Sequence, residues 1–203
     1  MIDVNRNETI SEEYKKYIDR IEPHKKIVYC SLGTVLELHQ KKGGVNIKRF
    51  FEILLSVFSV KNDYHLIISM EETFKKQLGA IPKNVKIFEK VPQIDLLKRC
   101  DLFITHGGMN SILESATLGI PMLVFPLNED WDQNGNAARI IFHQIGLMGN
   151  IKHDNAEQIN DRIELLLTDG KYSKNVNEMS NLLKKYTSES FLEDFFSTEL
   201  LVH

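Results

Sequence analysis

The amino-acid sequence predicts an α/β fold, in which a Rossmann-like parallel sheet carries helices on both faces. Three observations support this prediction. Short apolar runs alternate with segments of helical periodicity from Ile27 onward, the runs are continuous as in buried strands, and the connections between segments are short. Such alternation is typical of parallel strands that are joined by crossover helices.

Each predicted strand is a short apolar run that ends at or near turn residues. The first run, Ile27–Leu32, stops before Gly33, which indicates a buried strand. A further strand is flanked by His143 and His153. The remaining predicted strands, in chain order, are His65–Ser69, Val85–Phe88, Leu102–Thr105 and Pro121–Phe125.

The predicted helices lie between these strands or after them. Apolar residues from Phe50 to Phe58 recur at helical spacing, and Gly119 is a stop signal for the helix before it. Asn155 and Gln158 have the spacing of a capping box that opens a helix. The full set of expected helices comprises the segments around Phe50–Phe58, Glu71–Leu78, Ile94–Cys100, Met109–Leu118, Asn134–Ile145, Asn155–Leu167, Ser173–Tyr186 and Glu189–Leu201.

Composition places the chain among ordinary globular proteins. Its 203 residues suffice for one full core, and 42% of them are hydrophobic. A net charge of −3 argues against a nucleic-acid-binding surface. No apolar run reaches the length of a membrane span, and the first residues lack a signal-peptide core. Cys30 and Cys100 are interpreted as buried free thiols in a reducing compartment, so we expect a cytoplasmic protein.

Four loops are expected to meet at one edge of the sheet, because each of them follows a predicted strand. Ligands of open parallel sheets bind beyond the carboxyl ends of the strands. We therefore expect the binding cleft at this edge, although its loops are far apart in the sequence. The four loops are residues 31–34, 89–93, 105–108 and 126–133.

The most informative of these loops is the turn His106-Gly107-Gly108, which joins a predicted strand to a predicted helix. Glycine has no Cβ, so these amides can approach an anion closely. The first turn of the helix adds unsatisfied N–H groups and the positive end of its dipole. His106, Asn110 and Ser111 add side-chain donors. The pattern indicates a phosphate site, but a turn that merely requires glycine fits this stretch equally well on its own.

Glu114 has two interpretations that the local pattern leaves open. Ser111 and Glu114 have the spacing of a capping box, which would make both residues structural. If the helix already begins near Gly108, Ser111 lies inside it and Glu114 faces the cleft. There its carboxylate could accept two hydrogen bonds from a ribose diol.

Two further pairs of residues are candidate ligands of a sugar nucleotide. Asp132 and Gln133 combine a carboxylate with an amide, which suits the hydroxyl groups of a hexose, and they would hang over the cleft. Val91 and Gln93 flank Pro92, which favours extended backbone before it. Such backbone could hydrogen-bond the edge of a flat base, and a simple turn before a helix explains the same residues equally well.

Other kinds of site fit this sequence less well. Asp130-Trp131-Asp132 spells a D-x-D metal–diphosphate motif, but a preformed anion site already serves the phosphates. The stretch 31–34 lacks the full dinucleotide fingerprint, which argues against NAD. The seven histidines show no metal-ligand spacing. Asp101 and His106 fall near one another, yet no nucleophile completes a triad, so hydrolysis is not expected.

Taken together, these residues resemble the C-terminal half of a UDP-glycosyltransferase of the two-domain GT-B architecture. Order and spacing hold from about Lys25 to Leu147, and bacterial members that modify small lipophilic or natural-product acceptors are the most similar. The motifs that carry the resemblance are Tyr29-Cys30-Ser31-Leu32-Gly33-Thr34, Val91-Pro92-Gln93 with Leu97, Thr105-His106-Gly107-Gly108-Met109-Asn110-Ser111 with Glu114, Gly119-Ile120-Pro121, Pro126, and Asp132-Gln133 with Asn136-Ala137.

The resemblance implies a role for each candidate residue. Val91 and Gln93 would hold uracil and the neighbouring ribose, with Glu114 on the ribose hydroxyls. Asp132 and Gln133 would bind the hexose, for which glucose is the expectation. The residues that would bind the diphosphate are His106, Gly108, Asn110 and Ser111, helped by Gly33 and Thr34. Family members invert the anomeric centre without a metal, so no cofactor is expected, and the anion site stabilises the departing UDP.

Two features depart from the pattern of this family. Val91 stands where plant members carry a tryptophan that stacks on the base. The loop between Pro126 and Asp132 is two residues longer than the common pattern, so Asp130 occupies the usual count and Asp132 the usual Asp-Gln context. We favour Asp132, because Gln133 and Asn136 keep register with it.

The resemblance also implies which parts of the enzyme this chain does not contain. Family members carry the acceptor site and a histidine base in an N-terminal domain, so we expect no catalytic residue here and no activity of the chain by itself. Residues 1–24 are expected to be an interdomain linker remnant with a short helix near Glu12–Ile21. Residues 25–186 would be the donor-binding domain, and residues 187–203 a helix that packs toward the missing domain.

Three accounts of function follow from this resemblance. The first is an excised donor-binding half, which binds a UDP-sugar and whose exposed interdomain surface could produce dimers. The second is a natural subunit of a split glycosyltransferase that a separate partner completes. The third is a UDP-sugar-binding module without transfer.

Overall fold

The computed structural model describes residues 3–33, 46–128 and 132–186. Its centre is a six-stranded sheet with the order β3-β2-β1-β4-β5-β6. All neighbouring strands run parallel, as the sequence predicts. The strands are β1 (Lys26–Ser31), β2 (Tyr64–Ser69), β3 (Val85–Phe88), β4 (Leu102–Thr105), β5 (Met122–Val124) and β6 (Gly146–Met148).

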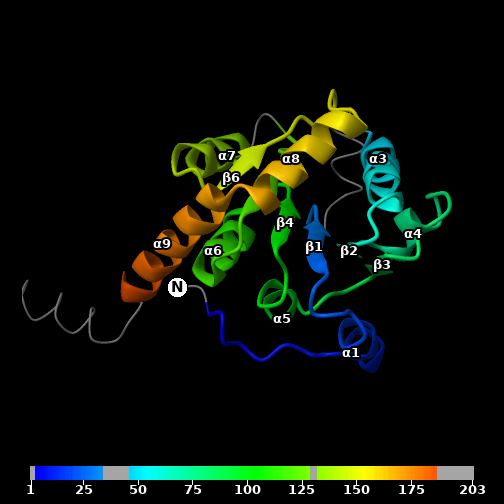
Figure 1. Ribbon diagram of the computed structural model, residues 1–203, viewed down its shortest axis with the longest axis horizontal. Coiled ribbons are helices and arrows are strands. Elements are labelled where there is room, and N and C mark those ends of the chain that lie inside the picture. Colours follow the sequence, from blue (N-terminus) through cyan, green and yellow to red (C-terminus); the bar gives the residue numbers. More distant parts are fainter. Residues whose placement is uncertain (1–2, 34–45, 129–131, 187–203) are drawn as a thin grey trace, which may run out of the picture.

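Helices cover both faces of this sheet (Figure 1). They match the predicted segments within the described residues. Several predicted helices end earlier in the structure, and the helices predicted from Phe50 and from Ser173 each begin three residues earlier. The predicted helix Glu189–Leu201 and the packing of residues 187–203 lie outside the described residues. The helices are α1 (Glu12–Ile18), α3 (Ile47–Ser59), α4 (Glu72–Lys75), α5 (Gln93–Leu97), α6 (Met109–Leu118), α7 (Gln133–Phe142), α8 (Ala156–Thr168) and α9 (Gly170–Tyr186).

Helix α7 ends three residues before the predicted boundary, at Phe142 rather than at Ile145. Gln144 has a positive φ of 51°, so the chain reverses there. The amide of Ile145 donates to the carbonyl of Ile140 and that of Gln144 to Ile141, which is a Schellman ending. Ile145 fits the helical period, but it is the apolar residue that folds back after the helix. The predicted stop at Gly119 and the predicted capping box of α8 are both confirmed.

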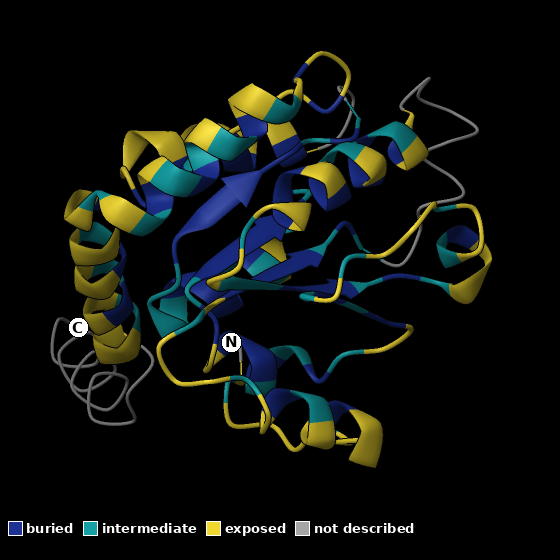
Figure 2. Cartoon of the chain, turned by 45° about the vertical axis from the view of Figure 1, so that its right-hand side comes forward, coloured by how far each residue is buried: buried dark blue, intermediate teal, exposed yellow. Residues whose placement is uncertain are grey.

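Two apolar layers explain why the strands read as continuous apolar runs. Side chains alternate between the two faces of a strand, and here helices cover both faces. Tyr29 and Phe103 point into the layer beneath α1, α5, α6, α7 and α9. Cys30 and Ile104 point into the layer beneath α3, α4 and α8. Figure 2 shows the buried sheet between helices that expose only their outer faces.

Cys30 and Cys100 are both buried and unbonded to each other, as predicted. Burial raises the pKa of each thiol, which keeps the thiols protonated and unreactive. No helix within the described parts of the chain is long and apolar enough to cross a membrane.

The segment before β1, for which the sequence predicts an interdomain linker, packs against the domain. Tyr14 and Ile18 of α1 are buried, and the Tyr14 hydroxyl donates to the Asp95 carboxylate at 2.8 Å. In Figure 1 the residues that precede α1 run past α6 and α5. The predicted short helix is confirmed, and the described part of this segment packs on the domain that follows it.

Strand order reverses between β1 and β4, which lie side by side at the centre of the sheet. Crevices for ligands form at such a switch point, beyond the carboxyl ends of the strands. The loop after β1 contains Gly33, and the loop after β4 contains the His106-Gly107-Gly108 turn. The topology thus places these two predicted site loops next to each other.

Candidate functional site

The N-terminus of α6 has the features of an anion site. The helix begins at Met109, with Gly108 as its N-cap and no side chain capping it. Its first backbone bond runs from the amide of Ile112 to the carbonyl of Gly108, at 3.1 Å. The amides of Met109, Asn110 and Ser111 therefore precede the hydrogen-bonded ladder of the helix. Such groups, together with the dipole, favour a negatively charged ligand.

Glycines allow the two site loops to approach the His106 ring closely. A Cβ on Gly33 would lie 3.0 Å from His106 Cε1, and one on Gly108 would lie 2.9 Å from His106 Nε2. Gly107 has a φ of +91°, and a Cβ there would lie 2.9 Å from the Val124 side chain. Packing alone accounts for glycine at these positions. The glycines are therefore compatible both with a phosphate site and with a turn that merely requires glycine. Thr34 lies outside the described residues.

The start of α6 decides between the two interpretations of Glu114. Ser111 is the third residue of the helix, so it cannot be its N-cap and the capping-box reading is wrong. Glu114 is 5% exposed and faces α5. The Gln93 amide donates from Nε2 to Glu114 Oε2 at 2.6 Å and to Ser111 Oγ at 3.3 Å. Three predicted site residues from two helices therefore meet.

Two unpredicted residues complete this group. The Tyr29 hydroxyl donates to Gln93 Oε1 at 3.2 Å, which orients the amide so that its nitrogen faces Glu114. Arg6 Nη1 donates to Glu114 Oε1 at 2.5 Å, and this hydrogen bond raises the pKa of the guanidinium. We call the five residues Arg6, Tyr29, Gln93, Ser111 and Glu114 the Glu114 cluster. Its centre is a carboxylate that has a bound donor on each oxygen.

A second group of side chains holds the turn that precedes α6. Asn136 is 1% exposed, and its Nδ2 donates to the carbonyl of Gly107 at 3.0 Å and to Asp132 Oδ2 at 3.2 Å. Arg139 Nη1 donates to Asn136 Oδ1 at 2.9 Å. We call Gly107, Asp132, Asn136 and Arg139 the Asn136 cluster. It ties the exposed carboxylate of Asp132 to the anion-site turn.

Gln133 does not lie as predicted in an open cleft. Its side chain is buried, with 2% of the residue exposed, and its Oε1 accepts from the amide of Leu127 at 2.7 Å. The amide therefore shapes the loop that follows β5, because that loop needs a partner for a buried N–H group. Of this predicted pair, Asp132 is the exposed member. Asp130 and Trp131, which the D-x-D alternative requires, lie outside the described residues.

Val91 lies in the turn before α5 and is half-buried against the apolar layer that contains Tyr29. A hollow of about 390 Å³ opens nearby, at the carboxyl ends of β1, β2 and β3. Among the described residues that line it, Gly33 is a predicted site residue, and three carboxylates belong to its rim. The lining residues are Ser31, Gly33, Ser69, Met70, Glu71, Glu72, Thr73, Glu89 and Lys90.

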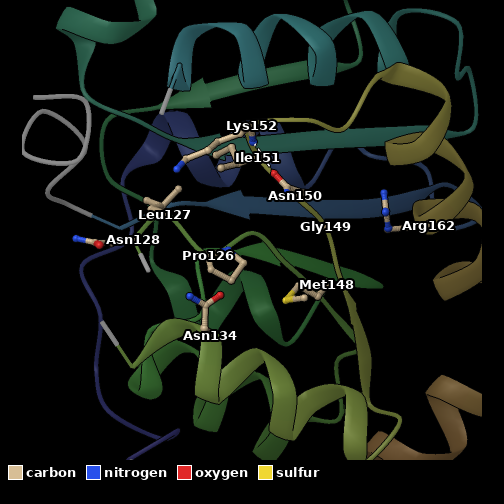
Figure 3. A pocket seen from close by; sticks show the side chains of 10 residues that line it. All are labelled: Pro126, Leu127, Asn128, Asn134, Met148, Gly149, Asn150, Ile151, Lys152 and Arg162. Carbon is tan, nitrogen blue, oxygen red and sulfur yellow. Dashed lines mark hydrogen bonds between the residues drawn. The ribbon is translucent and has the colours of Figure 1, made fainter. Parts of the chain in front are cut away.

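A second hollow, of about 270 Å³, lies beyond β5 and β6 (Figure 3). Its polar lining includes the side chains of Asn128, Asn134 and Asn150, together with Lys152 and Arg162. None of the predicted site residues is among the described residues that line it. It borders the loop that carries Asp132, because Asn128 and Asn134 come from either side of that loop.

Asp101 and His106 lie at opposite ends of β4, so their nearness in the sequence has no chemical consequence. Asp101 precedes the strand and binds Lys26 and the amide of Ile27, whereas His106 follows its end. Among the residues that the structure describes, no three His, Cys, Asp or Glu side chains are grouped so that they could hold a metal ion. A metal-free site remains a prediction from the resemblance.

Sequence reasoning missed Tyr29 and Arg6 for different reasons. Tyr29 lies in a buried strand, and a buried hydroxyl usually has a hydrogen-bond partner, so it could have been flagged. Arg6 lies in a polar stretch, 108 residues before the carboxylate that it binds, and no local pattern identifies it.

Comparison with known proteins identifies a family and several relatives. The family model described as "Erythromycin biosynthesis protein CIII-like, C-terminal domain" matches residues 53–186, which is more than half of the chain. An uncharacterized UDP-glucosyltransferase, YdhE of Bacillus subtilis (strain 168), is 29% identical over 79% of this chain and 38% of its own length. UDP-glycosyltransferase UGT4 of Dactylopius coccus is 32% identical over 78% of this chain and 29% of its own length.

Solved structures extend this likeness to the fold. The crystal structure of the glycotransferase of kitacinnamycin matches with a TM-score of 0.73 and 26% identity, over 88% of this chain and 44% of that chain. The fold class expected from the sequence is thereby confirmed. The chain spans less than half the length of these relatives.

Proposed function

Because this chain belongs to the family of the erythromycin biosynthesis protein CIII-like C-terminal domain, we propose that it is the donor-binding part of a glycosyltransferase and that it binds a UDP-sugar. The observation that carries this proposal is the Glu114 cluster beside the uncapped start of α6. A carboxylate and an amide there can bind a ribose diol, and free helix amides can bind a diphosphate.

The spacing of these two features supports one continuous ligand. Gly108 and Glu114 are six residues apart on one helix, which is about 9 Å along its axis. That distance is comparable with the span from a ribose to the second phosphate of a nucleoside diphosphate. The base would then extend toward Val91 and the hollow at the ends of β1, β2 and β3.

The Asn136 cluster supports a sugar on the other side of the phosphates. Asp132 is exposed and is joined to the turn through Asn136, so a hexose on the second phosphate would lie near its carboxylate. We propose UDP-glucose as the donor, because the named relatives include a UDP-glucosyltransferase. Gln133 would contribute to this subsite through the shape of the loop.

In the transfer itself, this domain would stabilise the leaving group. Negative charge develops on UDP as the glycosidic bond breaks, and preorganised amides at the start of α6 are in place to stabilise it. Deprotonation of an acceptor requires a general base, for which we assign no residue here. We therefore propose an inverting, metal-independent transfer that needs a second, acceptor-binding domain, and no transfer by this chain alone.

The direct test is a calorimetric titration of the chain with UDP and UDP-glucose. In the variant Glu114→Gln, the loss of charge-assisted hydrogen bonds to the ribose should weaken UDP binding about 10- to 100-fold. His143→Ala is the matched control, because His143 is exposed at the end of α7 and should leave the affinity unchanged. Absence of binding at millimolar UDP would contradict the proposed function.

A further inference from the structure

The segment Asp3–Glu8 is bent so that it delivers an arginine to the Glu114 cluster. The amide of Asn5 donates to Asp3 Oδ1 at 2.8 Å, and the amide of Arg6 to the carbonyl of Asp3 at 3.5 Å. These contacts form a turn stabilised by an aspartate side chain. The turn places the guanidinium of Arg6 on Glu114 Oε1.

Two anchors hold this segment: Arg6 binds Glu114 of α6, and Glu8 binds the start of α5. Glu8 Oε2 accepts from the amides of Ile94 and Asp95 at 2.8 and 3.2 Å, which satisfies donors at the start of that helix. Arg6 Nη2 also donates to Glu8 at 3.1 Å, so the two anchors are connected. Further along, the buried Tyr14 of α1 binds Asp95. The segment is therefore a bound strap and not a chance contact of one side chain.

The strap occupies the position that a ribose diol needs. Glu114 has 6% of its side chain exposed, and its two oxygens already accept from Arg6 and Gln93. Two ribose hydroxyls must donate to this same carboxylate. Gln93 comes from the body of the domain and is itself a predicted ribose ligand. Arg6 comes from the strap, so it is the partner that can leave.

We propose that Arg6 is a built-in competitor of the nucleotide ribose for Glu114, and that the segment Asp3–Glu8 must release Glu114 before the donor binds. This inference rests on the proposed function. The strap lowers the apparent donor affinity by the fraction of molecules in which Glu114 is covered. It also keeps the buried carboxylate paired while the site is empty, which avoids the cost of an isolated buried charge.

The competition should be moderate in size. The Arg6 side chain is 40% exposed, so solvent screens its attraction to Glu114. Removal of the guanidinium should therefore tighten UDP binding about three- to tenfold. A guanidinium that instead touched the diphosphate would have the opposite effect, because its removal would weaken binding.

The test is a titration of the whole 203-residue chain with UDP. Arg6→Ala is expected to bind UDP about three- to tenfold more tightly than the unaltered chain. Glu8→Gln, which loosens the second anchor, should give a smaller gain in the same direction. Arg20→Ala is the matched control, since Arg20 is an exposed arginine just after α1 and outside the strap, and it should bind UDP with unchanged affinity.

A second ligand tests where the competition occurs. The gain from Arg6→Ala should disappear with the 2′,3′-dideoxy analogue of UDP, which has no hydroxyls for Glu114. Equal or weaker UDP binding by Arg6→Ala would overturn the competition, as would an equal gain with the dideoxy analogue. If the unaltered chain and all variants fail to bind UDP, the proposed function fails instead.

Discussion

The Glu114 cluster includes residues of α6 and the Asn136 cluster holds the turn that precedes α6, yet the two clusters are built differently. In the Glu114 cluster, side chains bind other side chains from four separate segments. In the Asn136 cluster, a buried amide binds the backbone of Gly107 and holds Asp132 beside it. Contacts between side chains can be exchanged for contacts with a ligand at little cost to the fold. Contacts with the backbone set the shape of the anion site itself.

This difference predicts two kinds of variant. Changes in the Glu114 cluster should alter ligand affinity more than the free energy of unfolding. Changes in the Asn136 cluster and its turn should lower both quantities together. The predictions that follow test this division, beginning with the largest expected effect.

Gly107→Ala should disrupt the turn most strongly. The backbone has a φ of +91°, and the new Cβ would lie 2.9 Å from Val124 Cγ1 and 3.3 Å from the carbonyl oxygen of Gln133. We expect the free energy of unfolding to fall by about 2–4 kcal/mol, because strain and overpacking combine. UDP binding should be lost with it. Urea unfolding and calorimetry measure the two effects.

The control for this variant is Gly135→Ala. A Cβ on Gly135 meets nothing within 4 Å, and the residue lies inside α7. Alanine has less freedom in the unfolded chain, so this change should raise the free energy of unfolding by about 0.5–1 kcal/mol. If both alanines were neutral, the positive φ would not govern the turn.

Asn136→Ala should destabilise the domain by a smaller amount. It leaves the carbonyl of Gly107 without this buried donor, which costs about 1–3 kcal/mol of unfolding free energy. Binding of UDP-glucose should weaken more than binding of UDP, because Asp132 also loses its partner. Asn134→Ala, an exposed change in the same helical turn, is the comparison. If Asn134→Ala lost as much stability and affinity as Asn136→Ala, the Asn136 cluster would have no special role in holding the turn.

Tyr29→Phe should have the smallest effect. It tests the Glu114 cluster, in which ligand affinity should change more than the free energy of unfolding. It removes only the hydroxyl that orients the Gln93 amide. UDP binding should weaken about two- to fivefold, with about 1 kcal/mol or less lost in unfolding free energy. Calorimetry measures the change in UDP affinity, and thermal unfolding measures the change in stability. A loss of stability without any loss of affinity would show that Gln93 does not contact the ligand.

Most of the fold could be predicted from sequence because periodicity reports burial directly. Strands buried on both faces read as unbroken apolar runs, and each predicted strand from Ile27 to Phe125 is present in the structure. Helix ends were less predictable. Ile145 continues the apolar period of α7, but a left-handed Gln144 ends the helix first. The spacing of apolar residues gives no information about the φ angle of a single residue, so it could not predict this helix end.

The candidate site was predictable to the extent that its residues lie in one motif or at the end of one strand. Gln93, Ser111 and Glu114 were all identified, and the structure brings them together. Gln133 was identified by its neighbours in the sequence, but its side chain turns inward to Leu127. Alternation between exposed and buried positions at the start of a helix depends on how that helix packs.

The sequence by itself determined the parallel α/β sheet, the glycine turn before α6 and the identity of the carboxylate six residues beyond Gly108. These follow from local periodicity and from the conformational limits of glycine, which act within a few residues. Only the tertiary structure decided that Glu114 points toward Gln93 and that Arg6 covers it. That contact joins residues 108 positions apart, and its formation depends on how α1 and the strap pack against α5.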